Sequence, residues 1–317
     1  MIKHVISVSG GKDSTATLLI ALARCDRQHV VPIFCDTGNE HEQTYAYLDY
    51  LEQALDIKIT RLKADFTVQI ANKRLFIARD QRTGRDQAGR RIRWSNKAKR
   101  RALAVLHPTG NPFLDLCLWK GRFPSRKAQF CTQELKRDMA VMFQLDLIDQ
   151  GFDVLSWQGV RRDESYNRRN ARLFERIGRS LWTFRPIVTR TAADVFAYCA
   201  EKQVQPNPLY LQGMSRVGCM SCINVNKNEL REISLRFPEH LERIAEWERL
   251  VCAASKQAYS SFIADKHDAR DRREIFADLN IWARVEWSKT TRGGKQVDLL
   301  ADVTEPAACA SAYGLCE

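Results

Sequence analysis

Short apolar runs alternate with stretches of helical periodicity along the first 62 residues. Apolar, largely β-branched positions at 5–8, 29–35 and 57–62 have the length and composition of buried strands. Between these runs, apolar residues recur every three or four positions at 16–23 and 45–55, as on one face of a helix. This alternation is typical of a parallel sheet with helices on both faces. We therefore expect an α/β fold with a doubly wound parallel sheet.

The alternation pauses and then returns. Residues 72–111 form a basic, glycine-dotted insertion, after which the pattern predicts a helix over 133–148, a strand over 154–160 and an extended piece over 183–188. We expect residues 1–210 to form one α/β domain that carries this insertion.

The later part of the chain has helical patterning. Thr191 to Asp194 resembles a capping box, and Pro238 suits the first turn of a helix. Periodicity is lost over 288–308, which predicts a loop. We expect 211–317 to be a helical C-terminal region with a cysteine-containing tail.

The formal net charge of +12 is concentrated in two segments. Residues 72–101 contain twelve Lys and Arg against two Asp, and residues 161–185 contain eight Arg against three acidic residues. Such a field favours polyanions such as nucleotides, DNA or RNA. Trp94 among the arginines would add base stacking. The alternative is a solvated or partly helical surface excursion without a partner.

The composition narrows the class of protein. No run of 18 apolar residues is present, and the N-terminus enters a strand without the pattern of a signal peptide. We expect a cytoplasmic protein with no membrane partner. Its ten cysteines are then expected to be thiols, metal ligands or redox groups rather than a disulfide scaffold.

A glycine-rich turn lies between the first predicted strand and the first predicted helix. It consists of Ser9, Gly10, Gly11, Lys12, Asp13 and Ser14. Glycines let backbone N–H groups close on phosphate oxygens, the helix N-terminus adds partial positive charge, and Lys12 adds a full one. The spacing differs from G-x-x-x-x-G-K-[ST], which disfavours a standard P-loop NTPase. The six residues match the signature of the ATP-pyrophosphatase (PP-loop) enzymes.

Polar residues follow the second and fourth predicted strands, whose carboxyl ends should share an edge with the glycine-rich turn. The candidates for nucleotide binding there are Asp36, Thr37, Gly159, Arg161 and Arg162. Arginine forks suit phosphate or sulfate, and Asp163 or Glu164 could orient them or hold Mg²⁺. The alternatives are a capped strand-to-helix turn at Asp36 and a mixed-charge surface helix at Arg161.

Five cysteines form the candidate metal set. Cys219 and Cys222 make a C-x-x-C, Cys131 could add a third ligand, and Cys316 or Cys309 a fourth. Thiolate ligation at irregular spacing suits a [4Fe–4S] cluster or, as the lesser possibility, structural zinc. A redox dithiol or inert thiols remain open.

Together these segments resemble the phosphoadenosine phosphosulfate (PAPS) reductase family of the PP-loop superfamily, closest in motif to its sulfur-transfer branch, which inserts sulfur into DNA backbones. The resemblance covers most of the chain. It rests on Ser9 to Ser14, Asp36 to Glu40, Cys131-Thr132 with Leu135-Lys136, Gly159 to Ser165, Pro186-Ile187, and Asn207 to Tyr210 followed by Arg216 to Cys222. It implies that these residues form nucleotide and sulfur sites.

Three departures from the family shape the expectation. Lys12 is intact, whereas PAPS reductases tend to lack this lysine, which favours ATP as the substrate. Phe130 precedes Cys131 where cluster-bearing relatives pair two cysteines. The chain ends Gly314-Leu315-Cys316-Glu317, altered in order from the catalytic Glu-Cys-Gly-Leu-His, so Cys316 is either a ligand or a nucleophile.

The sequence thus predicts an enzyme that adenylates a substrate with ATP, releases pyrophosphate and prepares sulfur transfer, with Lys12 and Arg161 neutralising charge at phosphorus. The sulfur or electron donor is unspecified. One alternative is a thiol-dependent reductase of PAPS or adenylylsulfate that releases sulfite, with Cys316 as nucleophile. Another is a nucleic-acid-binding subunit of a DNA or RNA modification or defence complex.

Overall fold

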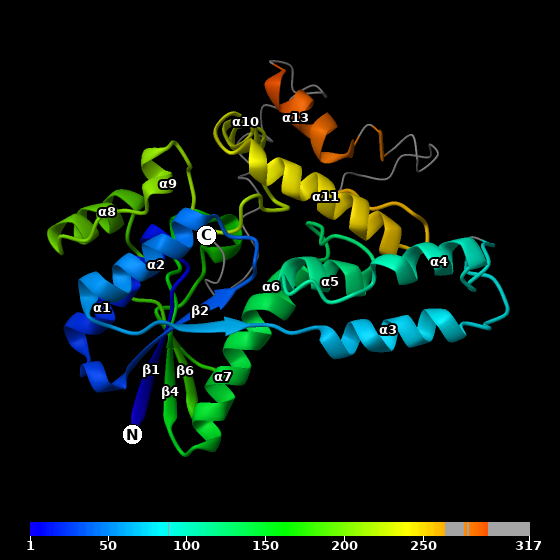
Figure 1. The fold of residues 1–317 in the computed structure, drawn as a ribbon. Coiled ribbons are helices and arrows are strands. Elements are labelled where there is room, and N and C mark those ends of the chain that lie inside the picture. Colours follow the sequence, from blue (N-terminus) through cyan, green and yellow to red (C-terminus); the bar gives the residue numbers. More distant parts are fainter. Residues whose placement is uncertain (88, 264–275, 278, 291–317) are drawn as a thin grey trace. The chain divides into compact units, whose positions relative to one another are not determined.

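In the computed structural model, a mostly parallel sheet forms the core of the part made by residues 1–64 and 129–229 (Figure 1). The structure describes residues 1–87, 89–263, 276–277 and 279–290. Its strands are β1 (Ile2–Ser7), β2 (Val30–Asp36), β3 (Thr60–Lys63), β4 (Asp153–Trp157), β5 (Phe174–Arg176) and β6 (Leu181–Phe184). They follow the order β3-β2-β1-β4-β6-β5, with only β5 antiparallel to its neighbour. The expected α/β fold with a doubly wound sheet is confirmed.

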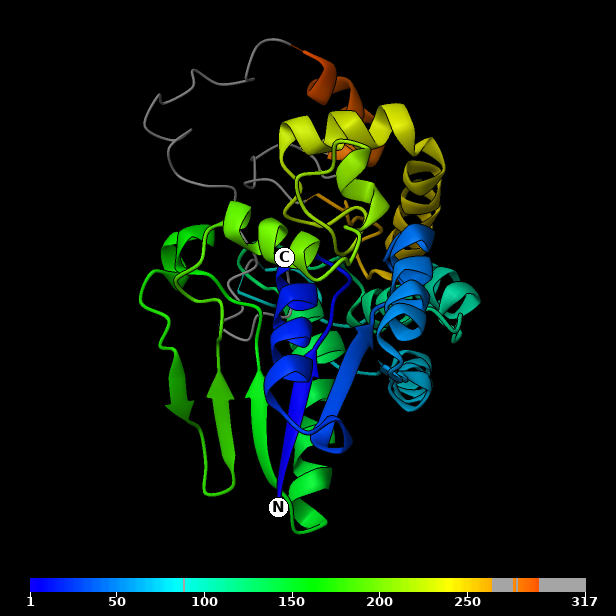
Figure 2. The ribbon, with the colours of Figure 1, turned by 90° about the vertical axis from the view of Figure 1, so that its left-hand side faces the viewer.

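Two layers of helices cover the sheet. On one face, Ile6 and Phe34 pack in a core with apolar residues of α1 (Lys12–Arg24), α2 (Glu42–Leu55) and α8 (Ala192–Glu201). On the other face, Val5 and Val154 pack against α7 (Asp138–Asp149). Figure 2 shows the strands nearly side by side. Successive residues of β1 point to opposite faces, so adjacent apolar residues serve both cores.

The chain divides into two packed units. The first contains Met1–Ala64 and Gln129–Glu229, and the second contains Asp65–Ala128 and the described part of Leu230–Lys295. This grouping differs from the expected boundary at residue 210, because residues 65–128 pack with the later helices.

The remaining elements complete both units. The further helices are α3 (Thr67–Arg79), α4 (Asn96–Val105), α5 (Pro112–Lys120), α6 (Phe130–Thr132), α9 (Pro208–Leu211), α10 (Lys227–Arg236), α11 (Pro238–Ala254) and α13 (Ile281–Lys289). A π-helical turn spans Gln133–Arg137, and 3₁₀ turns span Arg27–His29, Arg162–Glu164 and Tyr166–Arg168. Within the described ranges, every helix is too short or too polar to cross a bilayer.

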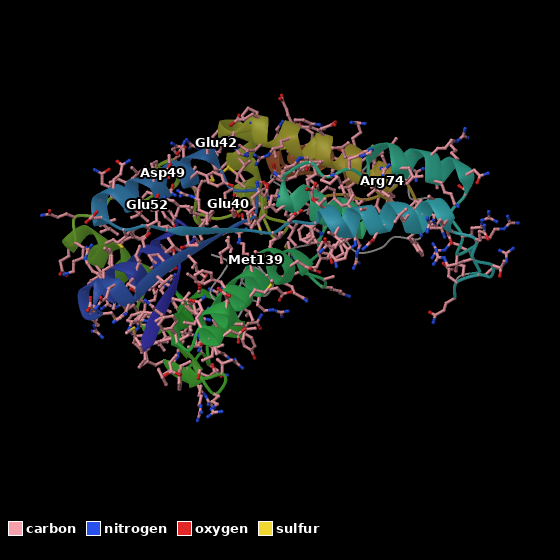
Figure 3. All side chains as sticks on the ribbon, turned by 60° about the horizontal axis from the view of Figure 1, so that its bottom comes forward. Glu40, Glu42, Asp49, Glu52, Arg74 and Met139 are labelled. Atoms are coloured by element: carbon pink, nitrogen blue, oxygen red, sulfur yellow. The ribbon has the colours of Figure 1, made fainter. Side chains whose placement is uncertain are left out.

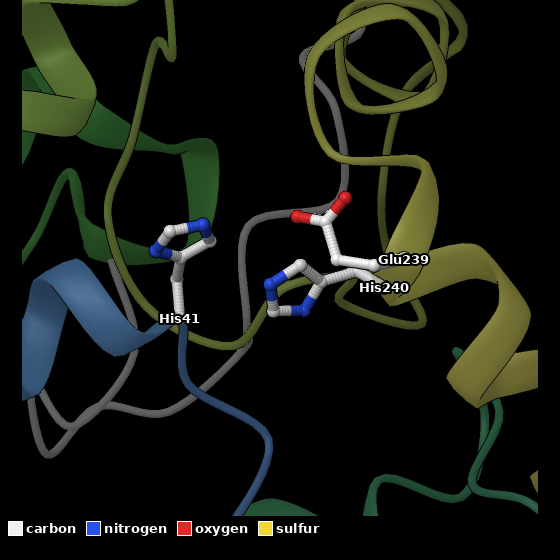
Figure 4. A group of neighbouring side chains, drawn as sticks. All are labelled: His41, Glu239 and His240. Carbon is white, nitrogen blue, oxygen red and sulfur yellow. The ribbon is translucent and has the colours of Figure 1, made fainter.

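Several helix starts follow from local sequence. Thr191 and Asp194 form the predicted capping box of α8, and Pro238 occupies the first turn of α11. His41, drawn in Figure 4, caps α2 because its Nδ1 accepts the Gln43 N–H at 3.0 Å. Figure 4 also draws Glu239 and His240, which belong to the first turn of α11 in the second unit.

The structure corrects details of the sequence-based elements. The fourth strand ends at Trp157 rather than at residue 160. Residues 208–211 form the short helix α9. The basic insertion is partly helical, since it contains the end of α3 and all of α4. Residues 288 and 289 still belong to α13, and residues 291–308 lie outside the described part.

Trp94 does not provide the expected stacking platform. Its side chain is only 6% exposed, and its backbone N–H donates to Asp80 Oδ2 at 2.8 Å. A ring buried in the protein core cannot stack on a base without local unfolding. The expectation of stacking was wrong because charged neighbours along the sequence do not determine which way an aromatic side chain points.

Candidate functional site

The glycine-rich turn joins β1 to α1 at the carboxyl edge of the sheet. Gly10 has a φ of +82°, and a Cβ there would lie 2.9 Å from Thr44 Cγ2. Glycine is therefore required at this position by both backbone conformation and space. Gly11 is the N-cap residue of α1, so the following backbone amides form the helix N-terminus. The turn has the form of an anion cradle.

Ser9 and Ser14 lock the turn from within. Ser14 Oγ donates to Gly11 O at 2.9 Å and accepts the Ser9 N–H at 3.1 Å. The two serine hydroxyls are also 3.0 Å apart. These contacts hold the loop in one conformation before a ligand binds, which lowers the ordering cost of binding.

Two residues almost two hundred positions away brace the same turn. Asn207 Nδ2 donates to Gly10 O at 3.1 Å, and Tyr210 Oη accepts the Lys12 N–H at 3.0 Å. Lys12 Nζ also lies 5.5 Å from the centre of the Tyr210 ring. The sequence identified these residues only as part of a family resemblance and assigned them no role. Their sole local signal was an Asn-Pro start of a helix.

The loop after β4 packs directly on the glycine-rich turn. Sheet order changes direction between β1 and β4, which makes this edge the switch point where ligands bind in such folds. A Cβ at Gly159 would come within 2.9 Å of Asp13 C and O and 3.0 Å of Ser14 N. The absence of a side chain at Gly159 therefore permits the close approach of two backbones.

A buried ion pair joins these two loops. Arg161 Nε donates to Asp13 Oδ1 at 2.7 Å, and its Nη1 donates to Asp163. Burial by itself would lower the pKa of Arg161, but the two carboxylates outweigh this and raise it. Lys12 Nζ lies 3.4 Å from Asp13 Oδ2. The predicted role of Arg161 at phosphorus stays a prediction, while its contacts show it positioning Asp13.

Arg162 lies differently from its neighbour. Its side chain is exposed, and Nε donates to Ala171 O at 3.0 Å. The two consecutive arginines thus have one buried and one exposed guanidinium, because Arg161 precedes the 3₁₀ turn that Arg162 begins.

The end of β2 forms a second polar cluster. Asp36 Oδ1 accepts the Gly38 N–H at 2.9 Å and the Tyr45 hydroxyl at 2.7 Å. Glu40, labelled in Figure 3, accepts the Thr37 hydroxyl at 2.7 Å. Burial and the nearby carboxylates raise the pKa of Tyr45, so its hydroxyl remains a donor. Asp36 thereby shapes the turn, and its role toward a nucleotide stays a prediction.

The C-x-x-C loop docks on this cluster. Met220 N donates to Asn39 O at 2.7 Å, and Asn39 Nδ2 donates to Ser221 O at 2.9 Å. The Cys219 thiol is 3.7 Å from Glu40 Oε1 and 3.6 Å from Thr37 Oγ1. The structure therefore brings Cys219 to the carboxyl end of β2, next to the strand that carries the glycine-rich turn.

Cys222 lies in a different electrostatic setting. The largely buried guanidinium of Arg216 interacts with the Cys222 thiol and donates from Nε to Glu229 Oε1 at 3.1 Å. Burial would lower the pKa of Arg216, but Cys222 and Glu229 raise it. Arg216 and Glu229 therefore fix the polar surroundings of Cys222, which differ from those of Cys219.

A narrow pocket lies among these groups. It has a volume of about 20 Å³ and is lined by Ser9, Cys35, Glu40, Lys136 and Gly218. Lys136 is 7% exposed and comes from the π-helical turn before α7. The family resemblance included Lys136 but assigned it no individual role. Turns of this π-helical kind are frequent at functional sites.

A second pocket of about 200 Å³ lies behind the glycine-rich turn. Its walls include Lys12, Thr15, Tyr47, Phe196 and Asn207. Thr15 and Asn207 are residues that bond the carbonyls of the turn. A cavity of about 150 Å³ can hold benzene, so this space accommodates one aromatic ring.

The phosphoadenosine phosphosulfate reductase domain model matches residues 3–225. The chain belongs to this family. The match spans the whole sheet, the glycine-rich turn and the C-x-x-C loop. Membership supports a nucleotide-related enzyme of sulfur metabolism within the PP-loop superfamily. We call the glycine-rich turn, Ser9 to Ser14, the PP-loop from here on.

Proteins from two phages and an archaeon are similar in sequence to this chain. An uncharacterized 37.8 kDa protein in the gpa 5′ region of Escherichia phage 186 is 45% identical over 338 residues, which cover 99% of this chain and 96% of that protein. An uncharacterized protein of Methanocaldococcus jannaschii is 25% identical over 78% of this chain and 41% of its own length. A nin region protein of Escherichia phage lambda is 27% identical over 51% of this chain and 49% of its own length.

Among solved structures, phosphoadenylyl-sulfate reductase from Candida auris, in a phosphate complex, has a TM-score of 0.41 and 14% identity. The match covers 69% of this chain and 82% of that one. The family assignment rests on the domain model and the phage 186 relative.

The family's cluster can be compared with the described cysteines. Cys131, Cys219 and Cys222 do not form a described group whose ligand atoms all lie within 4.8 Å of one another. Sulfurs on one zinc ion would be that close, because Zn–S bonds are about 2.3 Å. Thiolates around a four-iron cluster bind different irons and lie further apart. Cys309 and Cys316 lie outside the described residues, so the ligand set stays a prediction.

Proposed function

We propose that this PAPS reductase-family protein uses ATP to adenylate a substrate, with release of pyrophosphate, and so prepares it for sulfur transfer. The observation that carries the proposal is the complete PP-loop, with Lys12 present and the loop braced by Asn207 and Tyr210. A cradle ordered in advance and carrying a mobile cation suits the pyrophosphate end of ATP.

The residues around the PP-loop have different roles in the proposed reaction. Backbone amides at the start of α1 bind phosphate oxygens, and Lys12 neutralises charge that develops during P–O cleavage. Arg161 holds Asp13 and thereby sets where α1 begins. Asp163 would hold Mg²⁺, since this carboxylate is about half exposed beside Arg161, and the ion would supply charge that offsets that of the phosphates.

The sulfur chemistry is assigned to the cysteine loop. Cys219 and Cys222, with Cys131 and a tail cysteine, would hold a [4Fe–4S] cluster that supplies electrons or sulfur. The chemistry of the donors fits, since sulfur ligands suit iron–sulfur clusters, and the Cys219 thiol lies 3.6 Å from Thr37 Oγ1 at the carboxyl end of β2. Zinc is the lesser possibility.

The second candidate is thiol-dependent reduction of PAPS or adenylylsulfate, with sulfite as product. The family supports this reading, and the Cys219 thiol lies at the carboxyl end of β2, 3.6 Å from Thr37 Oγ1. It requires Cys316 as nucleophile and a thiol donor instead of ATP.

Offering each nucleotide separately to the anaerobically purified protein distinguishes the two. We expect ATP to bind and to release pyrophosphate once an acceptor is present, and binding to fall at least tenfold in Lys12→Ala. Lys3→Ala, which removes a partly buried lysine near the start of β1, at the other end of the strand from the PP-loop, should bind normally. Sulfite release from PAPS without ATP consumption would establish the reductase instead, and absence of nucleotide binding would reject both.

Iron and zinc analysis with a visible spectrum tests the cluster. We expect about four irons per chain and loss of the absorbance in Cys219→Ser and Cys222→Ser. Cys25→Ser, at the end of α1, is the matched control and should keep the iron. A colourless, iron-free protein after anaerobic purification contradicts the cluster.

A further inference from the structure

The net charge of the protein is concentrated in one stretch of the second unit. Residues 65–128 contain sixteen Lys and Arg against four Asp, a net charge of +12 that equals that of the whole chain. Residues 230–263 of the same unit contain five of each sign. The positive field therefore originates from α3, α4, α5 and their connections.

Several of these cations are held by neutral carbonyl groups. Arg74, labelled in Figure 3, donates from α3 to Leu103 O and Leu106 O at 2.7 and 2.8 Å. Arg101 donates to Ser255 O at 2.6 Å, and Lys99 donates to Asp80 O at 2.9 Å. A carbonyl fixes the side chain but does not cancel its charge. The framework is thus rigid and still positive.

One carboxylate organises the segment between α3 and α4. Asp80 accepts hydrogen bonds from Arg82 and from the Trp94 N–H, and the Arg82 bonds are the largest cause that holds its pKa below the usual range. Lys256 Nζ clips the same segment by donating to Arg91 O and Ile92 O at 2.6 and 2.8 Å. The basic segment is consequently a built surface with a buried anchor.

Five exposed cations of α3, α4 and the segment between them form what we call the basic surface. They are Arg79, Arg91, Arg93, Lys97 and Arg100. None of their side chains forms an ion pair with a carboxylate of the described residues. Lys97 also lies in the first turn of α4, where the helix dipole disfavours cations. Ion pairs within the described part of the chain therefore do not explain this arrangement.

We propose that the basic surface binds the phosphate backbone of a nucleic acid. Four of its five cations are arginines, whose forks match phosphate oxygens. A duplex presents one charge about every 1.7 Å, so a group of exposed cations can meet several phosphates at once. Because Trp94 is buried, contact is through the backbone and independent of sequence.

The test compares two full-length variants that lose the same charge. The first replaces Arg93, Lys97 and Arg100 with Ala on the basic surface. The second replaces Arg231, Arg236 and Arg249, which are exposed on α10 and α11 within the charge-neutral stretch 230–263. Fluorescence anisotropy with labelled duplex DNA, duplex RNA and single strands is recorded across salt concentrations, and ATP binding is measured in parallel.

We expect the wild type to bind duplex with a steep salt dependence. The basic-surface variant should bind at least tenfold more weakly, and its log–log salt slope should fall by about one for each phosphate that it no longer neutralises. The control variant should lose less than twofold in affinity, and ATP affinity should not change in either. The DNA and RNA arms show which backbone is preferred.

Three results overturn the proposal. They are no duplex binding by wild type at 50 mM salt, equal losses of affinity in the two variants, and competition by polyglutamate as effective as that by nucleic acid at matched charge. Thermal unfolding guards against misfolding: removing mutually repelling cations should leave the midpoint unchanged or higher. Because ATP binding is measured separately, failure of the nucleotide proposal is distinguishable from failure of this one.

Discussion

Arginines are used in opposite ways in the two units. At the PP-loop, Arg161 is buried and pairs with Asp13 and Asp163. In the second unit, Arg74 binds neutral carbonyls, and cations of the basic surface such as Arg93 and Lys97 are exposed. In the first arrangement, ion pairs with carboxylates neutralise the arginine and hold two loops together. In the second, the positive charge stays at the surface, where a partner can bind.

This difference shows why charge counts in a sequence mislead. Residues 161–185 and 72–101 both appear basic, yet Arg161, Arg168 and Arg185 of the first segment form ion pairs with Asp or Glu. Only the tertiary contacts distinguish charge used internally from charge that reaches solvent. The following predictions test that distinction, from the largest expected effect to the smallest.

Loss of the buried pair should be most costly. Arg161→Ala leaves the buried Asp13 carboxylate without this partner, and breaking such a pair typically costs about 3–5 kcal/mol. Denaturant unfolding should show this loss. Arg162→Ala, one residue on and exposed, should change stability little. Equal effects of the two substitutions would remove the contrast between buried and exposed arginines.

The second-largest loss of stability is expected where the loop after β4 packs closely on the PP-loop. Gly159→Ala forces a Cβ to 2.9 Å from Asp13 C, so the loops must shift, at a cost of about 1–3 kcal/mol. Unfolding and ATP titrations measure it. In Gly178→Ala the nearest atom is Leu181 Cβ at 3.8 Å, and stability should be nearly unchanged. A stable, ATP-binding Gly159→Ala would refute the packing argument.

The pH dependence of folding stability should have opposite signs for a buried acid with no cation partner among the described residues and for a buried acid that is paired. Glu248 accepts the Phe262 and Ile281 N–H groups, yet burial raises its pKa to about 7. The folded state then holds its proton up to higher pH than the unfolded state does. Stability should therefore fall between about pH 4.5 and 7, by at most about 1.4 kcal/mol per pH unit.

Glu248→Gln should abolish this decline, as measured by denaturant unfolding at several pH values. Nearby Cys252 has a pKa raised to about 11 by burial and remains neutral throughout the window. Glu246→Gln is the control, because Arg249 lowers the pKa of that exposed acid and the decline should persist. The same pH slope in Glu248→Gln and wild type would contradict the assignment.

The smallest effect is expected at the brace of the PP-loop. Tyr210→Phe removes the acceptor for the Lys12 N–H but keeps the ring, so stability should fall by about 1 kcal/mol. Tyr198→Phe, on α8, is the matched control. Thermal unfolding of the two variants gives the comparison, and no difference between them would mean that the hydroxyl does not hold the loop.

The sequence by itself determined the local features of this protein. The alternation of apolar runs predicted the sheet, the PP-loop lay where a glycine-rich turn had to join strand to helix, and the capping box at Thr191 formed as expected. These features depend on periodicity and on residues within a few positions of one another, which a single sequence contains.

Only the tertiary structure decided the rest. Arg161 meets Asp13 from 148 residues away, Tyr210 meets Lys12 from 198 residues away, and Trp94 turned inward although arginines surround it. Such contacts arise from how elements pack, and no local pattern specifies them. The physical reason is that burial and pairing are properties of the folded chain. The motif therefore predicted where the PP-loop lies, whereas packing determined which of the nearby charges are buried and paired.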